Sequence, residues 1–374
     1  MKAIVLSGGG ARGAYQVGVL KAISDVLSEH KLKNPFQIFC GVSAGAINAA
    51  AMAAEIHDFS VAVQKLTDLW SHLTSEQVFR TDAISLGRIG LQWMGELSLG
   101  GLTGGSPGRA LLDTSPLGDL IRNNLDFSGI QKNISSGDLK ALAITALDYR
   151  SSETVTFVQG DPEIPDWKRT RRHSEKTIIQ AEHVLASSAI PILFLPGQVQ
   201  DRFFGDGCVR NTSPLQPALK LGADHIMVIG VRRNQEFMGV SSLTGSKGPS
   251  IARVINVLMN SILLDGIEVD HERLERINEF ISRVPEQYRD NLNFREVKSL
   301  FIHPSEDIGA LAAQMSSSLP RIVRYLLKGL GPLEEASELI SYLLFEKEFT
   351  SRLIEMGYRD GMNMREEIRA FSEA

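Results

Sequence analysis

A short serine motif flanked by glycines constrains the fold of this chain more than any other feature of its sequence. The motif reads GVSAG at residues 41–45, after the apolar segment Phe36–Cys40 and at the start of the alanine-rich segment Ala44–His57. This pattern predicts a strand, a sharp turn and a helix, in which the glycines relieve crowding around a strained serine. Ser43 would then stand above the carboxyl end of a sheet, with the backbone N–H of Ala44 facing an oxyanion. The pentapeptide alone also fits a glycine-flanked helix N-cap.

Strand-like segments alternate with helical patterns along the rest of the chain. Apolar residues at helical spacing predict a helix from Arg12 to Leu27, and helical patterns dominate after residue 250. Strands are expected at Lys2–Ser7, Phe36–Cys40, Leu139–Leu147, Thr154–Val158, Arg202–Phe204, His225–Val231 and Val297–Ile302. The alternation favours a mostly parallel sheet with helices on both faces, a three-layer α/β/α architecture.

Chain length and glycine-rich segments indicate how the chain is divided. The 374 residues are enough for one large domain with an extension or for two domains. Leu86–Gly108 carries eight glycines and is expected to be a mobile surface loop, and Ser241–Ser250 is expected to be a linker. We predict a catalytic core in residues 1–215, the end of the α/β domain and a linker in residues 216–250, and a mostly helical extension in residues 251–374. Packing of that extension back on the sheet is left open.

Composition excludes several classes of function. The net charge of −5 provides no global basic field for nucleic acid. Cys40 and Cys208 are too few for a disulfide scaffold or a four-cysteine zinc site, and no calcium-loop motif occurs, so we expect no metal and no cofactor. The apolar run Ala3–Leu6 is too short for a signal peptide, and no segment reaches the roughly 18 apolar residues of a membrane span. We therefore expect a cytoplasmic enzyme whose contact with a membrane is peripheral.

A second glycine motif, GGGARG at residues 8–13, lies between the first predicted strand and the first predicted helix. It contains the dinucleotide pattern G-x-G-x-x-G, but the second strand runs into the serine motif where that function requires an acidic residue. It also lacks the Gly-Lys-Ser/Thr of a P-loop. Three consecutive glycines instead offer bare N–H groups, which suit an oxyanion or a phosphate. Arg12 adds a positive charge, unless it is solvated or bridges two elements.

A third motif places Asp206 between two glycines, directly after the strand predicted at Arg202–Phe204. Its carboxylate is sterically open to a partner, although an isolated Asp-Gly pair usually marks a turn.

These three motifs together resemble the patatin-like phospholipase family, at the level of its bacterial members. The resemblance runs from Ala3 to about Asn211, with further similarity down to Asp224–His225, and includes the stretch Ala186–Pro196. Cys208 stands where the family usually has glycine or alanine. The resemblance implies a patatin-type fold that hydrolyses lipid acyl esters, with Ser43 as nucleophile and Asp206 as proton acceptor. It also implies an oxyanion hole and four motif glycines; the hole comprises Gly8, Gly9, Gly10, Arg12 and Ala44, and the glycines are Gly13, Gly41, Gly45 and Gly207.

Other interpretations of the same residues stay open. Asp206 would have to be buried, because an aspartate near its ordinary pKa of about 3.9 is a poor base at neutral pH. His303, which follows a predicted strand, is the one histidine that could replace it. An acyltransferase would use the same acyl-enzyme, and a lipid-binding protein could retain a vestigial site. Phospholipid or another acyl-ester lipid is the expected substrate, and a homo-oligomer is an option.

Three further segments have weaker signals. The basic run Lys168–Arg172 either touches lipid headgroups or is solvated, and the apolar stripe Leu339–Phe345 either docks on a bilayer or packs inside the protein. Leu86–Gly108 carries large apolar residues among its glycines, so we expect it to border the entrance for the acyl chain.

Overall fold

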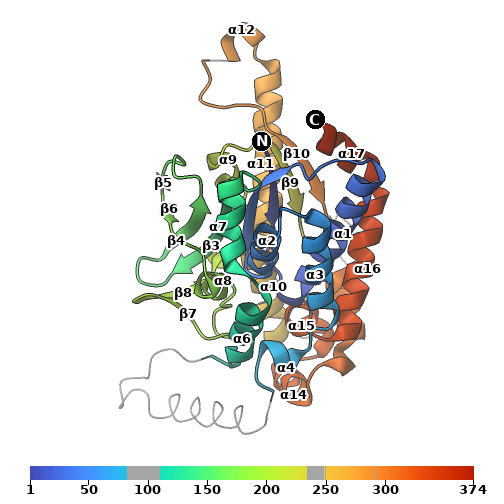
Figure 1. Ribbon diagram of the computed structural model, residues 1–374. Coiled ribbons are helices and arrows are strands. Elements are labelled where there is room, and N and C mark those ends of the chain that lie inside the picture. The colour runs from blue at the N-terminus through green and yellow to red at the C-terminus, as the bar shows by residue number, and fades with distance from the viewer. Residues whose placement is uncertain (82–109, 234–247, 249, 290) are drawn as a thin grey trace.

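A single ten-stranded sheet organises the protein (Figure 1). The computed structural model describes residues 1–81, 110–233, 248, 250–289 and 291–374. The strand order is β10-β9-β1-β2-β3-β4-β6-β5, with the hairpin β7–β8 attached through β8 to β3. The strands are β1 (Lys2–Leu6), β2 (Phe36–Val42), β3 (Ala141–Asp148), β4 (Glu153–Gly160), β5 (Lys168–Arg169), β6 (Arg172–Lys176), β7 (Gly197–Val199), β8 (Arg202–Asp206), β9 (His225–Ile229) and β10 (Lys298–Ile302).

The five neighbouring strands from β10 to β3 are all parallel, so their carboxyl ends meet at one edge of the sheet. β3 pairs antiparallel with β4 and with β8, which brings the end of β8 beside the end of β2. Parallel strands with helices on both faces are buried on both sides, as the apolar sequences of β1, β3 and β9 require. The mostly parallel α/β sheet predicted from the sequence is confirmed.

Helices cover the two faces of the sheet and form the outer layers (Figure 1). One face packs against α1 (Gly13–Glu29), α2 (Ala44–Ala54) and α3 (Phe59–Ser71), and the other against α9 (Gln216–Lys220) and α11 (Asp265–Arg283). The remaining helices are α4 (Ser75–Val78), α6 (Ser115–Asn124), α7 (Phe127–Ser136), α8 (Ala181–Ser187), α10 (Ile251–Leu263), α12 (Glu286–Arg289), α13 (Ile308–Gln314), α14 (Arg321–Leu330), α15 (Ser337–Leu343), α16 (Lys347–Asn363) and α17 (Arg365–Glu373). Short 3₁₀ turns are η1 (Gly10–Arg12), η2 (Gly207–Arg210), η3 (Ser316–Ser318) and η4 (Leu333–Ala336).

The C-terminal region packs closely on the N-terminal region. α16 lies along α1 in Figure 1, and two glycines let the helix backbones touch. A Cβ atom on Gly18 would stand 2.0 Å from the Ile354 carbonyl oxygen, and one on Gly357 would stand 2.1 Å from that of Tyr15. Because neither contact leaves room for a methyl group, the two helices depend on glycine for their spacing.

The structure contains a strand at each segment where the sequence predicted one, and β5, β6 and β7 in addition. β10 comes from residues 298–302, so the region beyond residue 250 contributes an edge strand as well as helices. Whether residues 251–374 form a unit of their own stays a prediction. The predicted loop Leu86–Gly108 lies outside the described residues, as does most of the predicted linker Ser241–Ser250. Within the described part of the chain, no helix is long and apolar enough to cross a membrane.

Candidate active site

Ser43 occupies a strained turn between β2 and α2. Its φ of 55° and ψ of −128° are unusual for a residue with a side chain, and a hydrogen bond from its N–H to the Ser187 hydroxyl (2.9 Å) holds it there. Ser187 in turn donates to the Thr145 carbonyl oxygen at 2.6 Å, which ties the turn to β3. Ser187 was not among the predicted site residues, although it lies in the stretch Ala186–Pro196 that carries part of the family resemblance.

The motif glycines on both sides of Ser43 are required by close contacts. A Cβ atom on Gly41 would lie 2.2 Å from the Gly45 carbonyl oxygen, and one on Gly45 would lie 2.2 Å from that of Leu6. At Gly207 a Cβ atom would lie 2.1 Å from the Thr145 carbonyl oxygen. Any larger residue at these positions would force the ends of the strands apart.

Asp206 ends β8 and meets the Ser43 hydroxyl. Its carboxylate accepts a hydrogen bond from the backbone N–H of Cys208 (2.9 Å), and the Ser43 hydroxyl and the Cys208 thiol lie close enough to it to favour its charged form. The residue is only 1% exposed. Burial raises the pKa of Asp206 to about 6, although the Ser43 hydroxyl and the N–H and thiol of Cys208 favour the charged form and oppose the shift. The structure therefore brings the serine and the aspartate together in a buried site.

The Cys208 thiol contacts both the proposed base and the glycine loop. Its thiol lies between the Asp206 carboxylate and the N–H of Gly8, and burial raises its pKa well above the ordinary range, so that it is a neutral donor. A Cβ atom on Gly8 would lie 2.4 Å from the Cys208 sulfur and 2.8 Å from the Ser43 Cβ atom. The glycine loop therefore lies directly against both Ser43 and Cys208.

Of the other residues of the expected oxyanion hole, Ala44, Gly9 and Gly10 lie at the helix start or in the glycine loop, and Arg12 has its side chain directed away. Ala44 is the first residue of α2, so its N–H has no acceptor within the helix. Gly9 and Gly10 belong to the same loop as Gly8, and Gly10 has a φ of +58° and packs under Tyr342, whose carbonyl oxygen would be 2.4 Å from a Cβ atom there. The Arg12 side chain points elsewhere.

Arg12 is buried in a polar cluster formed with the C-terminal region. Its guanidinium pairs with Glu338 and donates to the Ser341 hydroxyl (2.7 Å) and the Val231 carbonyl oxygen (3.3 Å). It also lies over the ring of Tyr342, 5.2 Å from the centroid. With every side of the guanidinium engaged, Arg12 is the bridging arginine considered above, and its expected place in the oxyanion hole is corrected to a role in holding the loop.

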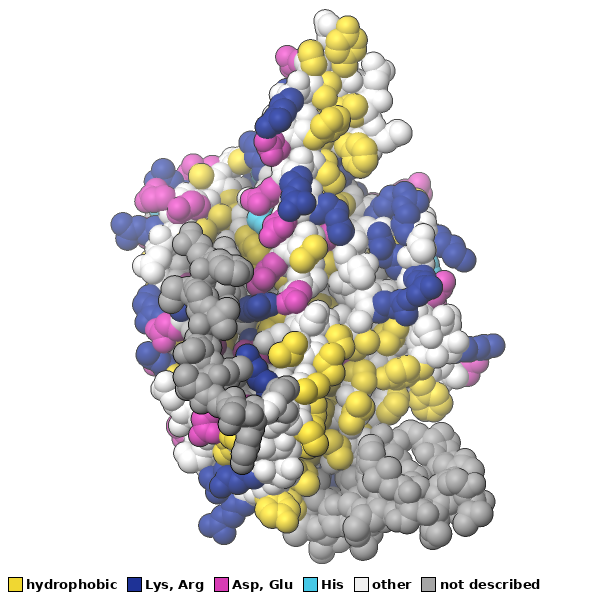
Figure 2. Space-filling view, turned by 180° about the vertical axis from the view of Figure 1, so that it is seen from behind, with side chains coloured by type: hydrophobic (Ala, Val, Ile, Leu, Met, Phe, Trp, Pro, Cys, Tyr) yellow, Lys and Arg dark blue, Asp and Glu magenta, His cyan; other side chains and the backbone are white. Residues whose placement is uncertain are grey.

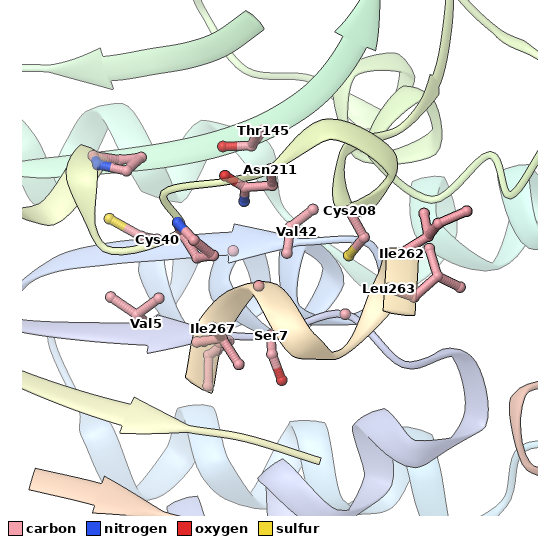
Figure 3. Close-up of a pocket in the computed structure, with 16 residues that line it drawn as sticks. Val5, Ser7, Cys40, Val42, Thr145, Cys208, Asn211, Ile262, Leu263 and Ile267 are labelled. Atoms are coloured by element: carbon pink, nitrogen blue, oxygen red, sulfur yellow. The ribbon is translucent and has the colours of Figure 1, made fainter. Parts of the chain in front are cut away.

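Two cavities adjoin the site on opposite faces of the sheet. An apolar pocket on the α2–α3 face reaches Ser43 and is lined by side chains that include Ile47, Trp70, Leu117 and Phe345. A second cavity lies behind Cys208 on the α10–α11 face; Figure 3 shows Cys208, Ile262 and Leu263 at one end of it and Cys40 at the other. That cavity has a volume of about 30 Å³, enough for about one water molecule.

His303 lies away from the dyad. It follows β10, which is separated from β2 by β9 and β1, and its ring approaches the Pro304 carbonyl oxygen and the ring of Phe301. Among the described residues, no group of three or more His, Cys, Asp or Glu side chains is placed to bind a metal ion.

Comparison with known proteins gives a family match. The family model of patatin-like phospholipases matches residues 4–219, more than half of the chain. No curated protein sequence matches at a significant level.

Several solved structures are similar at low identity. Human GIVD cytosolic phospholipase A2 in complex with methyl gamma-linolenyl fluorophosphonate is 14% identical, with a TM-score of 0.45, and the match covers 100% of this chain and 59% of that one. The type III effector protein ExoU is 16% identical, with a TM-score of 0.37 and coverages of 98% and 53%. VipD from Legionella pneumophila is 13% identical, with a TM-score of 0.35 and coverages of 98% and 67%. The chain thus spans between about half and two thirds of these proteins, and such loose superpositions assign no residues.

Proposed function

The chain belongs to the patatin-like phospholipase family, and we propose that it hydrolyses acyl esters of phospholipids or related lipids through a Ser43–Asp206 dyad. The observation that carries this proposal is the position of the Ser43 hydroxyl, at a strained strand–helix turn, beside the buried Asp206 carboxylate. A serine hydroxyl alone is a weak nucleophile and needs an adjacent base. A carboxylate with a pKa of about 6 is a better base at neutral pH than an exposed aspartate.

The proposed reaction has two half-reactions. Ser43 Oγ attacks the ester carbonyl while Asp206 takes its proton, and the tetrahedral oxyanion is held by N–H groups of Gly8, Gly9, Gly10 and Ala44. Asp206 then returns the proton to the leaving alcohol, which leaves an acyl-enzyme. Water attacks the acyl-enzyme with the same base, and the carboxylic acid leaves. Each donor to the oxyanion contributes about 3 kcal/mol of transition-state stabilisation.

The apolar pocket beside Ser43 supports an acyl chain as the substrate group. Its wall is almost entirely apolar, with residues from α2, α3, α6 and the segment before β7. Because an alkyl chain gains about 0.8 kcal/mol per buried CH₂ group, such a wall favours long acyl chains over acetyl esters. In the structure the pocket is narrow, so its side chains must move apart to admit a chain. The predicted entrance at Leu86–Gly108 stays a prediction.

We further propose that the enzyme is cytoplasmic and contacts a membrane transiently through α10 and α14. Figure 2 shows a band of hydrophobic side chains over the lower half of this face. The exposed residues are Ile251, Val254, Val257, Leu258 and Ile262 on α10 and Tyr325 and Leu326 on α14. The two helices also carry Arg253, Arg321, Arg324 and Lys328 but no acidic residue.

This charge favours an anionic lipid surface as the occupant of the α10–α14 face. Ion pairs involving the four cations are absent among the described residues, and a two-fold dimer through this face would set cations against cations. The earlier candidate for membrane contact, the stripe Leu339–Phe345, is instead buried within the protein.

Product analysis on mixed phospholipid vesicles tests the proposed function. The wild type should release free fatty acid, and the matched Ser43→Ala variant should release none above background. A product carrying the acyl group on an added alcohol, rather than free acid, would make the protein an acyltransferase. A wild-type protein that neither turns over lipid nor reacts with a fluorophosphonate would be a lipid-binding protein, and the proposal would be wrong.

A further inference from the structure

A large basic cavity lies on the face of the sheet that carries α9 and α11. It has a volume of about 410 Å³ and is bounded by β5, β6, α9, α11 and the segment 293–297. Five cationic side chains and one acidic side chain line it, namely Arg169, Arg172, Lys220, Arg273, Arg295 and Asp270. Neither Ser43 nor Asp206 lines the cavity, so it is separate from the proposed active site.

The positive charge distinguishes this cavity from two others of similar size. A cavity of about 480 Å³ beside α3 is lined by Lys65 and by the acidic Glu55, Asp68 and Asp126. One of about 300 Å³ beside α6 is lined by Arg122 and by Asp113, Asp119 and Glu182. Both have more acidic than basic side chains, as does the whole chain with its net charge of −5. The excess of cations in the basic cavity is therefore not explained by the composition of the chain.

Most of the cations in the basic cavity are available to a ligand. Within the described residues, Arg273 alone makes an ion pair, with Asp270 at 3.0 Å. Arg295 is held in place by hydrogen bonds to the Leu219 and Ala223 carbonyl oxygens, at 3.0 and 2.9 Å. Arg172 Nε is buried and finds no hydrogen-bond partner in this part of the chain. A buried donor without an acceptor is costly, and the guanidinium would have to shift for an anion in the cavity to satisfy this N–H.

The cavity also has an apolar wall. Leu219, Leu274, Ile277 and Phe294 lie on the side formed by α9, α11 and the segment before β10. Volumes of about 300–1,000 Å³ are typical of sites for small organic molecules, which combine an apolar lining with a few fixed polar groups. The ligand that fits is therefore larger than a simple anion.

We propose that this basic cavity binds a phosphorylated organic molecule of the size of a nucleotide or an inositol phosphate. Arginine guanidinium groups present paired N–H donors that match phosphate oxygens, and the run Arg169–Arg172 supplies two of them from one hairpin. The organic part would lie against the apolar wall. The basic run in β5 and β6, which the sequence left as either solvated or headgroup-binding, thereby gains a defined ligand class.

Binding measured by titration calorimetry tests the proposal with three probes: ATP, inositol 1,4,5-trisphosphate and inorganic phosphate. We expect at least one of the two organic phosphates to bind with a Kd of about 100 µM or tighter, and inorganic phosphate at least about tenfold more weakly. Preference for ATP would identify a nucleotide site, and preference for the inositol phosphate a headgroup site. No binding of either organic phosphate at millimolar concentration, or equal binding of inorganic phosphate, would overturn the proposal.

Charge variants locate the site. Arg169 and Lys220 have no acidic partner among the described residues, so the double change Arg169→Glu and Lys220→Glu should leave the melting temperature near that of the wild type while weakening binding about tenfold or more. The matched control is Arg276→Glu, on α11 one turn beyond Arg273 and 78% exposed. Unchanged binding in the double variant, or an equal loss in the control, would contradict the assignment. If the double variant unfolds, the neutral pair Arg169→Gln and Lys220→Gln replaces it, with the same expected loss.

Discussion

The N-terminal and C-terminal regions contribute to the active site in different ways. The residues proposed to act on the substrate lie within residues 4–219, the part that the family model matches. The region after residue 250 supplies supports: the partly buried Glu338 and the buried Ser341 bind Arg12, and the backbone of Tyr342 covers Gly10. The residues proposed to act on the substrate therefore lie in local motifs, whereas the shape of the glycine loop depends on residues more than 300 positions away.

The largest expected effect is a loss of activity without a loss of stability, in the Ser43→Ala variant. Ser43→Ala should reduce kcat/KM on a soluble ester at least about 10³-fold, because no other group replaces the attacking oxygen. The melting temperature should stay near that of the wild type, since the Ser43 backbone is held by its own N–H bond to Ser187. Retention of a tenth of the activity in the folded variant would remove Ser43 from the mechanism.

A change in the C-terminal region should lower the free energy of unfolding, which Ser43→Ala is expected to leave near that of the wild type. Glu338→Ala leaves the 2%-exposed Arg12 without its anionic partner, and breaking a buried ion pair costs about 3 kcal/mol in the free energy of unfolding. Chemical denaturation measures this loss. The matched control is Glu355→Ala, because Glu355 is 70% exposed and pairs with Arg352 at 3.5 Å, a contact that contributes about 0.5 kcal/mol or less. Equal losses in the two variants would show that the ion pair of Arg12 with Glu338 stabilises the fold no more than an exposed ion pair does.

Sequence reasoning found the local motifs and missed their distant partners for a physical reason. Strained turns need glycine at fixed offsets, so Gly41 and Gly45 could be recognised from the spacing of the serine motif, whereas Gly207 was identified through the family resemblance. The partner of Arg12 could not be predicted, because no local pattern indicates that the glutamate 326 residues away, rather than another, binds it. β5 and β7 were missed because strands of two and three residues have no detectable alternation.

The pH dependence of hydrolysis should reveal the base. Asp206 accepts a proton only when charged, and its raised pKa means that kcat/KM should fall as pH drops through about 6, about tenfold per unit below it. The Cys208 thiol favours the charged form, so Cys208→Ala should move the acidic limb to higher pH. A limb near pH 4 in the wild type, or an unshifted limb in this variant, would contradict the account.

The smallest effect is expected for His303→Ala, a change in the C-terminal region outside its supporting cluster. The His303 ring contacts Pro304 and Phe301 rather than the dyad, so kcat/KM should stay within about twofold of the wild type. A loss of two orders of magnitude in the folded variant would indicate a triad with its base in the C-terminal region. That region would then take part in the reaction instead of only supporting the glycine loop.

The most direct test of the dyad is the kcat/KM of Asp206→Asn on a soluble ester, with the melting temperature measured on the same preparation. The amide keeps the shape of the carboxylate and can still accept the Cys208 N–H bond, but it cannot take the proton from Ser43. The account predicts a loss of about 10²–10⁴-fold in kcat/KM with the fold intact. A folded Asp206→Asn protein that retains more than a tenth of the wild-type kcat/KM would contradict it.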